Sequence, residues 1–374
     1  MIDSDVMVDT GLKLSVSREA LLEKLGLVSR AVSSRTAVLV LGGIQLRAVD
    51  GELHLAATDM ELSLRSSVEA DVAGEGEVVV PGRLLLDIAR SLPESEVSIE
   101  HAAGESLLVL TCGSASYRIH TYSAEDFPRL PEIDASRLQS VDRDALVETV
   151  ARVGRSASRD ESRPVLTGIL VRFEPGKIVM AATDSYRLAV KETAAESSLP
   201  ELEAIIPARA LQELSRLDVS DLQLGVYENH VVFGSEGTWL TTRRIDGQFP
   251  NYRQLLPEQF EHTLQLPREE LLDVVRRVSV MAQRNSPLRL RFADGELTVS
   301  AQTQDVGEAR ESLPAAFVGD VLEIGFNADF LRDGLESVDA STVTLKLISP
   351  LRPAVLEGET ADYTYLIMPI RLAG

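Results

Sequence analysis

Two repeated aspartates are the residues whose type and spacing could best support acid–base chemistry. Asp59 ends the phrase Ala-Ala-Thr-Asp, and Asp184 ends the same phrase 125 residues later. A positioned carboxylate can act as a general acid or base. A blurred third copy ends at Thr303, which has no carboxylate. Because an aspartate after a strand is usually a turn residue, we interpret both aspartates as turn residues and expect no catalysis.

Other signatures of an active site or a cofactor site are missing from the sequence. It has no Gly-x-x-x-x-Gly-Lys loop, no His-Glu-x-x-His helix and no Gly-x-Ser-x-Gly elbow. Its five histidines lack the spacing of metal ligands. The single cysteine, Cys112, cannot form an intrachain disulfide and lies in an apolar stretch. We therefore expect no metal, no cofactor and no enzymatic activity.

Basic side chains recur on the polar faces of segments with helical spacing. Arg152, Arg155 and Arg159 occupy positions i, i+3 and i+7, which form one stripe on a helix. For any single helix, bases that follow acids simply complement the helix dipole. Six helices facing one way favour contact with the phosphates of duplex DNA. The candidate contacts are Lys24, Arg30, Arg35, Arg83, Arg90, Arg152, Arg155, Arg159, Arg209, Arg216, Arg277 and Arg284.

The net charge of −21 at first argues against nucleic acid as a partner. Net charge is a sum over the whole chain, however, whereas binding depends on where the charges lie. Acidic residues concentrate in the expected strands and loops, and basic residues concentrate in the expected helices. This distribution predicts an acidic outer surface and a less acidic inner one.

Three repeats of about 120 residues position these side chains. After each copy of the phrase comes a second marker, in the order Phe127-Pro128, Phe249-Pro250 and Met368-Pro369. A fixed period of self-similarity is the sequence signature of a repeat architecture. We predict three homologous domains, with ranges 1–133, 134–257 and 258–374.

Each repeat consists of a strand, a helix and three strands, twice over. Apolar spacing predicts helices at about 17–28, 81–91, 142–153, 207–217, 268–282 and 328–337, and strands that include 43–49, 52–57, 61–68 and 363–371. This order predicts an α+β fold with helices on one side of antiparallel sheets. A head-to-tail interface can close such units into a ring, with helices inside and sheets outside. Six helices from each of two chains would enclose roughly 24 Å, enough for a DNA duplex.

Nothing in the sequence predicts membrane association. No apolar run approaches the ~20 residues of a membrane span. The first ten residues are acidic and lack the order of a signal peptide. We expect a cytoplasmic protein without membrane contact.

Three longer stretches resemble a known family. Ala-Ala-Thr-Asp-Ser-Tyr-Arg-Leu-Ala at 181–189, Asp-Gly-Gln-Phe-Pro-Asn-Tyr at 246–252 and Met-Pro-Ile-Arg-Leu at 368–372 are similar to those of bacterial DNA sliding clamps, the beta subunits of DNA polymerase III. The resemblance covers essentially the whole chain after residue 10. It implies a head-to-tail homodimer that encircles duplex DNA, and a non-catalytic processivity factor that tethers the DNA polymerase III catalytic subunit. It further implies contacts with the clamp loader and with other polymerases and repair proteins.

The resemblance also implies a cleft between domains two and three that takes a short linear peptide from these partners. We expect Met368 and Pro369 to form one wall, Leu188 and Leu255 the floor, and Arg187 a polar handle. The implied cleft residues are Leu166, Thr183, Ser185, Tyr186, Arg187, Leu188, Pro250, Leu255, Asn327, Phe330, Leu351, Pro353, Met368, Pro369, Ile370 and Arg371.

Two further sites follow from the resemblance. Arg35 and Arg163 correspond to loop positions near the duplex. The dimer contact would pair Tyr117 and Ile119 of domain one with Val280 and Met281 of domain three. The competing hypothesis is a repeat scaffold that binds only protein partners, and the basic helix residues distinguish the two.

Overall fold

The structure is a computed structural model of the chain. It describes residues 11–33, 38–93, 95–102, 104–195, 201–217, 219–235, 237–282, 286–303 and 307–372. These form two compact units: residues 1–141 with 213–243, and residues 142–212 with 244–374. We call them the first and the second unit and describe each by itself. Within the described residues, no helix is long and apolar enough to cross a membrane.

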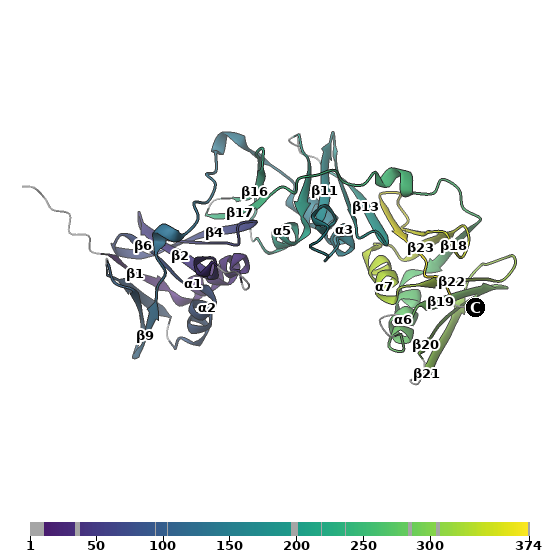
Figure 1. The fold of residues 1–374 in the computed structure, drawn as a ribbon, viewed down its shortest axis with the longest axis horizontal. Helices are drawn as coiled ribbons and strands as arrows, with labels where there is room; N and C mark the ends of the chain where they lie inside the picture. Colours follow the sequence, from purple (N-terminus) through teal and green to yellow (C-terminus); the bar gives the residue numbers. More distant parts are fainter. Residues whose placement is uncertain are drawn as a thin grey trace, which may run out of the picture. The chain divides into compact units, whose positions relative to one another are not determined.

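The described residues of the first unit form two antiparallel sheets and two α-helices, α1 (Arg18–Val28) and α2 (Gly82–Ser91) (Figure 1). One sheet has the order β5 (Asp71–Gly74), β1 (Leu12–Ser17), β7 (Glu96–His101), β8 (Leu107–Cys112), β9 (Ala115–His120). The other has the order β10 (Leu138–Ser140), β15 (Gln223–Val226), β16 (His230–Ser235), β17 (Thr238–Arg243), β4 (Leu62–Glu69), β3 (Glu52–Thr58), β2 (Gly43–Val49), β6 (Gly76–Pro81). Helix α1 packs on β3, β4 and α2.

The second unit repeats this plan with α3 (Arg143–Val153), α4 (Pro164–Thr167), α6 (Arg268–Ser279) and α7 (Ala328–Ser337). Its larger sheet has the order β14 (Glu203–Pro207), β11 (Gly168–Glu174), β12 (Lys177–Thr183), β13 (Arg187–Ala194), β25 (Tyr363–Ile367), β24 (Ala354–Glu357), β23 (Thr342–Leu347), β18 (His262–Pro267). Its smaller sheet has the order β21 (Gly307–Pro314), β20 (Glu296–Thr303), β19 (Leu288–Ala293), β22 (Leu322–Phe326). Helix α5 (Ala208–Glu213) crosses the division between the units.

The helices cover one face of the sheets because apolar side chains line one side of each helix. In α1, Leu21, Leu25 and Val28 are buried, and α6 buries Leu271, Val275 and Val278. Figure 1 shows α6 and α7 side by side, and the two helices contact each other. The predicted α+β class is confirmed.

Local signals account for several helix starts. The Asp142 carboxylate accepts a hydrogen bond from Ala145 N at 3.0 Å, which confirms it as the N-cap of α3. Asn327 caps α7 in the same way, through Phe330 N at 3.0 Å. Ser17 lies at the N-cap of α1, but its hydroxyl makes no capping hydrogen bond.

Some predicted bounds are wrong. The predicted helix at 268–282 ends at Ser279, and the one at 207–217 is a six-residue helix followed by a 3₁₀ turn, Leu214–Arg216. The predicted strand at 363–371 ends at Ile367. Beyond it, the chain forms no named strand but pairs with β22 through the isolated bridge between Ile370 and Gly325.

The two units do not coincide with the three repeats, because sheets continue from one repeat into the next. Strand β4 of repeat one pairs with β17 of repeat two. Strand β13 of repeat two likewise pairs with β25 of repeat three. The predicted domain ranges remain a prediction for this reason.

Candidate partner and DNA sites

The two repeated aspartates are turn residues. The Asp184 carboxylate accepts hydrogen bonds from Tyr186 N at 2.9 Å and Arg187 N at 3.0 Å. Asp59 accepts the corresponding bonds from Glu61 N and Leu62 N. In both turns the intervening residue has a positive φ, 79° at Ser185 and 77° at Met60. These aspartates shape the turns between strands and are engaged there.

The Asp184 turn presents an exposed aromatic side chain. Tyr186 is 61 % exposed, and its ring stacks on that of Phe330 with centroids 6.5 Å apart. Met368, 39 % exposed, lies next to this pair, since its N donates to Tyr186 O at 2.8 Å. The structure therefore brings together three of the predicted cleft residues, drawn from repeats two and three. Leu255 and Leu351 are also exposed apolar side chains of the second unit.

The segment after Met368 is fixed rather than frayed. Ile370 N donates to Gly325 O at 2.8 Å. A Cβ added at Gly325 would lie 2.9 Å from the backbone oxygen of Ile370 and 2.6 Å from the end of the Leu372 side chain. A glycine at 325 is thus required for the C-terminal segment to lie against β22.

Arg187 connects the turn to α7 from inside the protein. Its guanidinium donates to Asp333 at 2.6 Å, to Asp184 at 3.1 Å and to the backbone oxygen of Arg155. It also lies over the Phe330 ring, 4.3 Å from the centroid. Burial opposes the charge, but Tyr365 and Asp333 outweigh it and hold the pKa of Arg187 above its ordinary value.

The expectations for Arg187 and Leu188 are therefore wrong in one respect. Arg187 is 8 % exposed and fully engaged, so it positions the turn and Phe330 and is no free handle for a peptide. Leu188 is 1 % exposed and belongs to a core cluster with Val190, Phe249 and Leu366. Leu166 and Thr183 are buried as well. The surface available to a partner consists of the other predicted cleft residues, namely Ser185, Tyr186, Pro250, Leu255, Asn327, Phe330, Leu351, Pro353, Met368, Pro369, Ile370 and Arg371.

Most of the predicted DNA contacts form ion pairs within the protein. Arg152 and Arg155 bind acids that belong to or follow α7, and Arg276 shares Glu336 with Arg155. The hydrogen bond from Arg276 lowers the pKa of Glu336, although burial opposes this shift. The pairs are Lys24 with Glu23, Arg30 with Glu213, Arg90 with Asp87, Arg152 with Asp339, Arg155 with Glu336, Arg163 with Asp160, Arg216 with Glu213 and Arg277 with Glu311.

This pairing corrects the expectation of a solvent-facing stripe. The Arg152 side chain is only 20 % exposed, because it lies against Asp339 and the backbone oxygen of Ser337. Arg83 and Arg159 are exposed and form no ion pair within the described part of the chain. Arg209 is exposed on α5. Arg35 and Arg284 lie outside the described residues.

The residues of the predicted dimer contact differ in how far they are exposed, and the contact itself remains a prediction. Val280 is 82 % exposed just after α6, and Tyr117 is half-buried on β9. Met281 is half-buried, and its backbone oxygen accepts a hydrogen bond from the Thr303 hydroxyl at 2.6 Å. Ile119 is only 2 % exposed, so its side chain packs inside the first unit and offers little surface to a second chain.

The sequence did not predict that strands β9 and β21 lie at the edges of their sheets. Strand β9 ends the five-stranded sheet, and β21 ends the four-stranded sheet. Edge strands present unpaired backbone groups that another strand can join. A position at a sheet edge depends on topology, which the residue pattern of a single strand does not encode.

The fold and these sites define an α+β repeat protein with an exposed apolar surface around Tyr186 and Met368. Comparison with known proteins supplies the family. The sequence matches the DNA polymerase III beta subunit N-terminal domain over residues 12–131, its central domain over 140–251 and its C-terminal domain over 253–371. The chain belongs to this family, the bacterial sliding clamps, which are non-catalytic processivity factors that tether a polymerase.

Similar proteins match over nearly their whole length. The beta sliding clamp of Streptomyces coelicolor is 35 % identical over 379 residues, covering 97 % of this chain and all of that protein. That of Synechococcus elongatus is 35 % identical over 375 residues, covering 96 % and 100 %. The crystal structure of the DNA polymerase III subunit beta from Pseudomonas aeruginosa has a TM-score of 0.87 at 29 % identity, covering 96 % and 100 %. The Bacillus subtilis sliding clamp, at 24 % identity and a TM-score of 0.89, shares the fold.

Proposed function

We propose that the chain acts as a head-to-tail homodimer that encircles duplex DNA and binds the DNA polymerase III catalytic subunit. The partner contact is a short linear motif that docks on the surface around Tyr186 and Met368. The clamp loader, other polymerases and repair proteins use the same surface, and the protein works in the cytoplasm. The observation that carries the proposal is the exposed Tyr186–Phe330 stack joined to Met368. An exposed apolar surface with fixed polar neighbours suits a peptide partner.

Primer extension on a long single-stranded circular template tests the tethering. With the polymerase, its clamp loader and this protein, products should reach full length in one binding event. A Tyr186→Ser variant should return product lengths to those of the polymerase alone. Unchanged lengths with the wild-type protein would contradict the proposal.

The scaffold hypothesis has one observation in its favour. Acids from α7 and β21 already neutralise Arg155, Arg276 and Arg277. Under the DNA hypothesis, phosphates compete for these guanidiniums, and the exposed arginines make the first contacts.

The double variant Arg83→Glu/Arg159→Glu separates the two hypotheses. Both side chains are exposed and form no ion pair within the described residues, so the melting temperature should change little. Each lost phosphate contact reduces the slope of log K against log salt by about one. The homodimer carries both residues twice, so its slope should fall by up to about four. The matched control, Arg291→Glu/Arg352→Glu, changes the net charge equally at two other exposed arginines. Equal DNA affinity of the two double variants would favour the protein scaffold.

Val280→Asp should weaken the homodimer at least tenfold without unfolding the chain. Val280 is 82 % exposed, so the carboxylate is solvated in the monomer and loses water only in an interface. Sedimentation velocity at micromolar concentration measures the change. Val318→Asp, at an 87 % exposed valine of the same unit, is the control. A wild-type protein that sediments as a monomer would contradict the dimer.

A further inference from the structure

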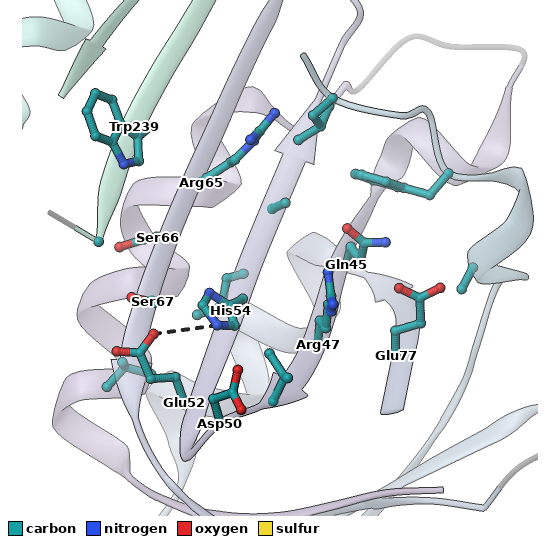
Figure 2. A pocket seen from close by; sticks show the side chains of 18 of the residues that line it. Gln45, Arg47, Asp50, Glu52, His54, Arg65, Ser66, Ser67, Glu77 and Trp239 are labelled. Carbon is teal, nitrogen blue, oxygen red and sulfur yellow. Dashed lines mark ion pairs between the residues drawn. The ribbon is translucent and has the colours of Figure 1, made fainter. Parts of the chain in front are cut away.

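A groove of about 1130 Å³ lies on the first unit, and none of its lining residues is assigned above to a peptide (Figure 2). It occupies the face of the larger sheet opposite the buried one. Along β2, for example, Ile44, Leu46 and Ala48 are buried. The alternating residues form the floor of the groove, and segment 124–130 and Trp239 complete its lining. The floor residues are Gln45, Arg47, Val49, Glu52, His54, Ala56, Arg65, Ser67 and Glu69.

Arg65 is a partly buried guanidinium of this groove that forms no ion pair within the described residues. Arg65 donates one hydrogen bond, to the backbone oxygen of Pro131. Its Nε is buried and has no hydrogen-bond partner, and within the described residues no carboxylate lies within ion-pair distance. Burial lowers the pKa of Arg65. A desolvated charge without a counter-ion costs stability, which an incoming carboxylate would restore.

The row of residues across the sheet at Arg65 has a counterpart in the second unit, and the two rows can be compared residue by residue. Across the strands of the first unit runs the row Val79, Gln45, Ala56, Arg65, Trp239. The corresponding row of the second unit is Ile205, Leu170, Ala181, Val190, Thr364. Both alanines belong to the Ala-Ala-Thr-Asp phrase, which fixes the correspondence.

In the second unit, this row is closed by the chain itself. Leu170, Val190 and Ile205 form one apolar cluster with Phe249 and Tyr252 of the following segment. In the first unit, Phe127 packs on Val79 and Val40, beside Ala56 and Leu130. Gln45 and Arg65 stand where the second unit has Leu170 and Val190. Because Gln45 and Arg65 are polar, the following segment does not form an apolar cluster over them as it does in the second unit, and the groove stays open at Arg65.

A second pair of corresponding positions also leaves an arginine without an ion pair in the first unit but not in the second. In the second unit, Arg172 binds Glu203 through two hydrogen bonds of 3.0 Å. The corresponding neighbours across β2 and β6 are Arg47 and Glu77. Arg47 is exposed and forms no ion pair within the described residues. The groove therefore offers two guanidiniums where repeat two offers none.

The two ends of the groove differ in character. Figure 2 shows Trp239 near Arg65 at one end and Asp50 and Glu52 at the other. Leu130 and Phe127 add apolar surface to the lining. In total, three arginines face five carboxylates, Asp50, Glu52, Glu69, Glu77 and Glu125. The excess of acid disfavours a polyanion such as a nucleic acid backbone.

We propose that this groove is a second docking site, which binds a short extended peptide segment of a partner protein. The segment carries an acidic residue that pairs with Arg65 and Arg47. An aromatic or aliphatic residue on one side of the acid packs against Trp239, and a basic residue on the other side meets Glu52 and Glu69. This order matches the charge of the groove from end to end.

Peptide selection with counter-selection tests the proposal without assuming a partner. Phage-displayed random hexapeptides are selected on the full-length protein, after removal of those that bind Arg65→Val, the variant that copies Val190. Peptides for the surface around Tyr186 bind both proteins and are discarded. The retained peptides should contain Asp or Glu next to an aromatic or aliphatic residue.

The synthesised peptides are then titrated by intrinsic fluorescence, because Trp239 is the single tryptophan of the chain. Binding should be saturable and should weaken at least tenfold for Arg65→Val and for Gln45→Leu. Arg118→Val, at an exposed arginine of β9, should bind as the wild type does.

Three results would overturn the proposal. The selection could return no peptide that distinguishes wild type from Arg65→Val. The retained peptides could lack an acidic residue or leave the Trp239 fluorescence unchanged. Finally, duplex DNA could displace them, which would assign the groove to nucleic acid. None of these results depends on peptide binding around Tyr186.

Discussion

Deletion of Met368–Gly374 should abolish partner-peptide binding, with a loss of at least a hundredfold in affinity. The deletion removes the exposed Met368 side chain and its hydrogen bond to Tyr186 O, so the Tyr186–Phe330 stack loses its neighbour. A few central anchors carry most of the energy of an interface. Fluorescence anisotropy with a labelled peptide that contains a glutamine, a leucine and a final aromatic residue measures the affinity.

Two control proteins make the deletion interpretable. Removal of Ala373–Gly374 alone leaves the contacts of Met368, Ile370 and Leu372 in place and should bind the peptide normally. Met368→Glu keeps the backbone bonds and should lose most of the affinity by itself. Equal peptide affinity of the full deletion and the wild type would show that residues 368–374 do not contribute to the peptide site.

Arg187→Met should destabilise the second unit by about 3–5 kcal/mol, the cost of leaving one partner of a buried ion pair alone. The variant removes the nearer cation of Asp333, which keeps only Arg155 at 3.7 Å, and the cation that pairs with Asp184. It also removes the guanidinium from the Phe330 ring. Since Phe330 supports Tyr186, peptide affinity should fall as well. Urea denaturation followed by circular dichroism gives the free energy of unfolding.

A double variant distinguishes the contribution of the Arg187–Asp333 ion pair to stability from that of side-chain packing. Arg187→Met/Asp333→Leu removes both charges, so it should recover part of the stability lost in the single variant. Arg291→Met, at an exposed arginine of the same unit that does not touch the turn, should change stability little. An Arg187→Met protein as stable as the wild type would show that the buried network does not hold the turn.

The repeat architecture could be predicted because its signals are local. Asp142 caps its helix through the adjacent turn, and Asp184 closes a turn two and three residues away. These interactions depend on residues close together in the sequence. The Ala-Ala-Thr-Asp phrase therefore marked the same structural position in repeats one and two.

The sites were less predictable because they depend on residues distant in the sequence. Arg152 looked solvent-facing on its helix, but Asp339 binds it from 187 residues away. The sequence predicted Arg187 as a polar contact for a peptide, but in the structure its guanidinium donates hydrogen bonds to Asp333 and Tyr365, which are distant in the sequence. The groove at Arg65 could not be predicted, because it depends on the register that places Trp239 of β17 beside Arg65 of β4, and the sequence of one strand does not encode its register with another.

Retention on closed and open DNA tests the central claim most directly. The protein is loaded by its clamp loader onto a nicked circular plasmid, and half of the sample is linearised with a restriction enzyme. Gel filtration then separates the DNA-bound protein from the free protein. We predict that the protein stays on the circle and leaves the linear DNA through its free ends. Equal retention on both, or loss from both, would contradict a ring that encircles the duplex.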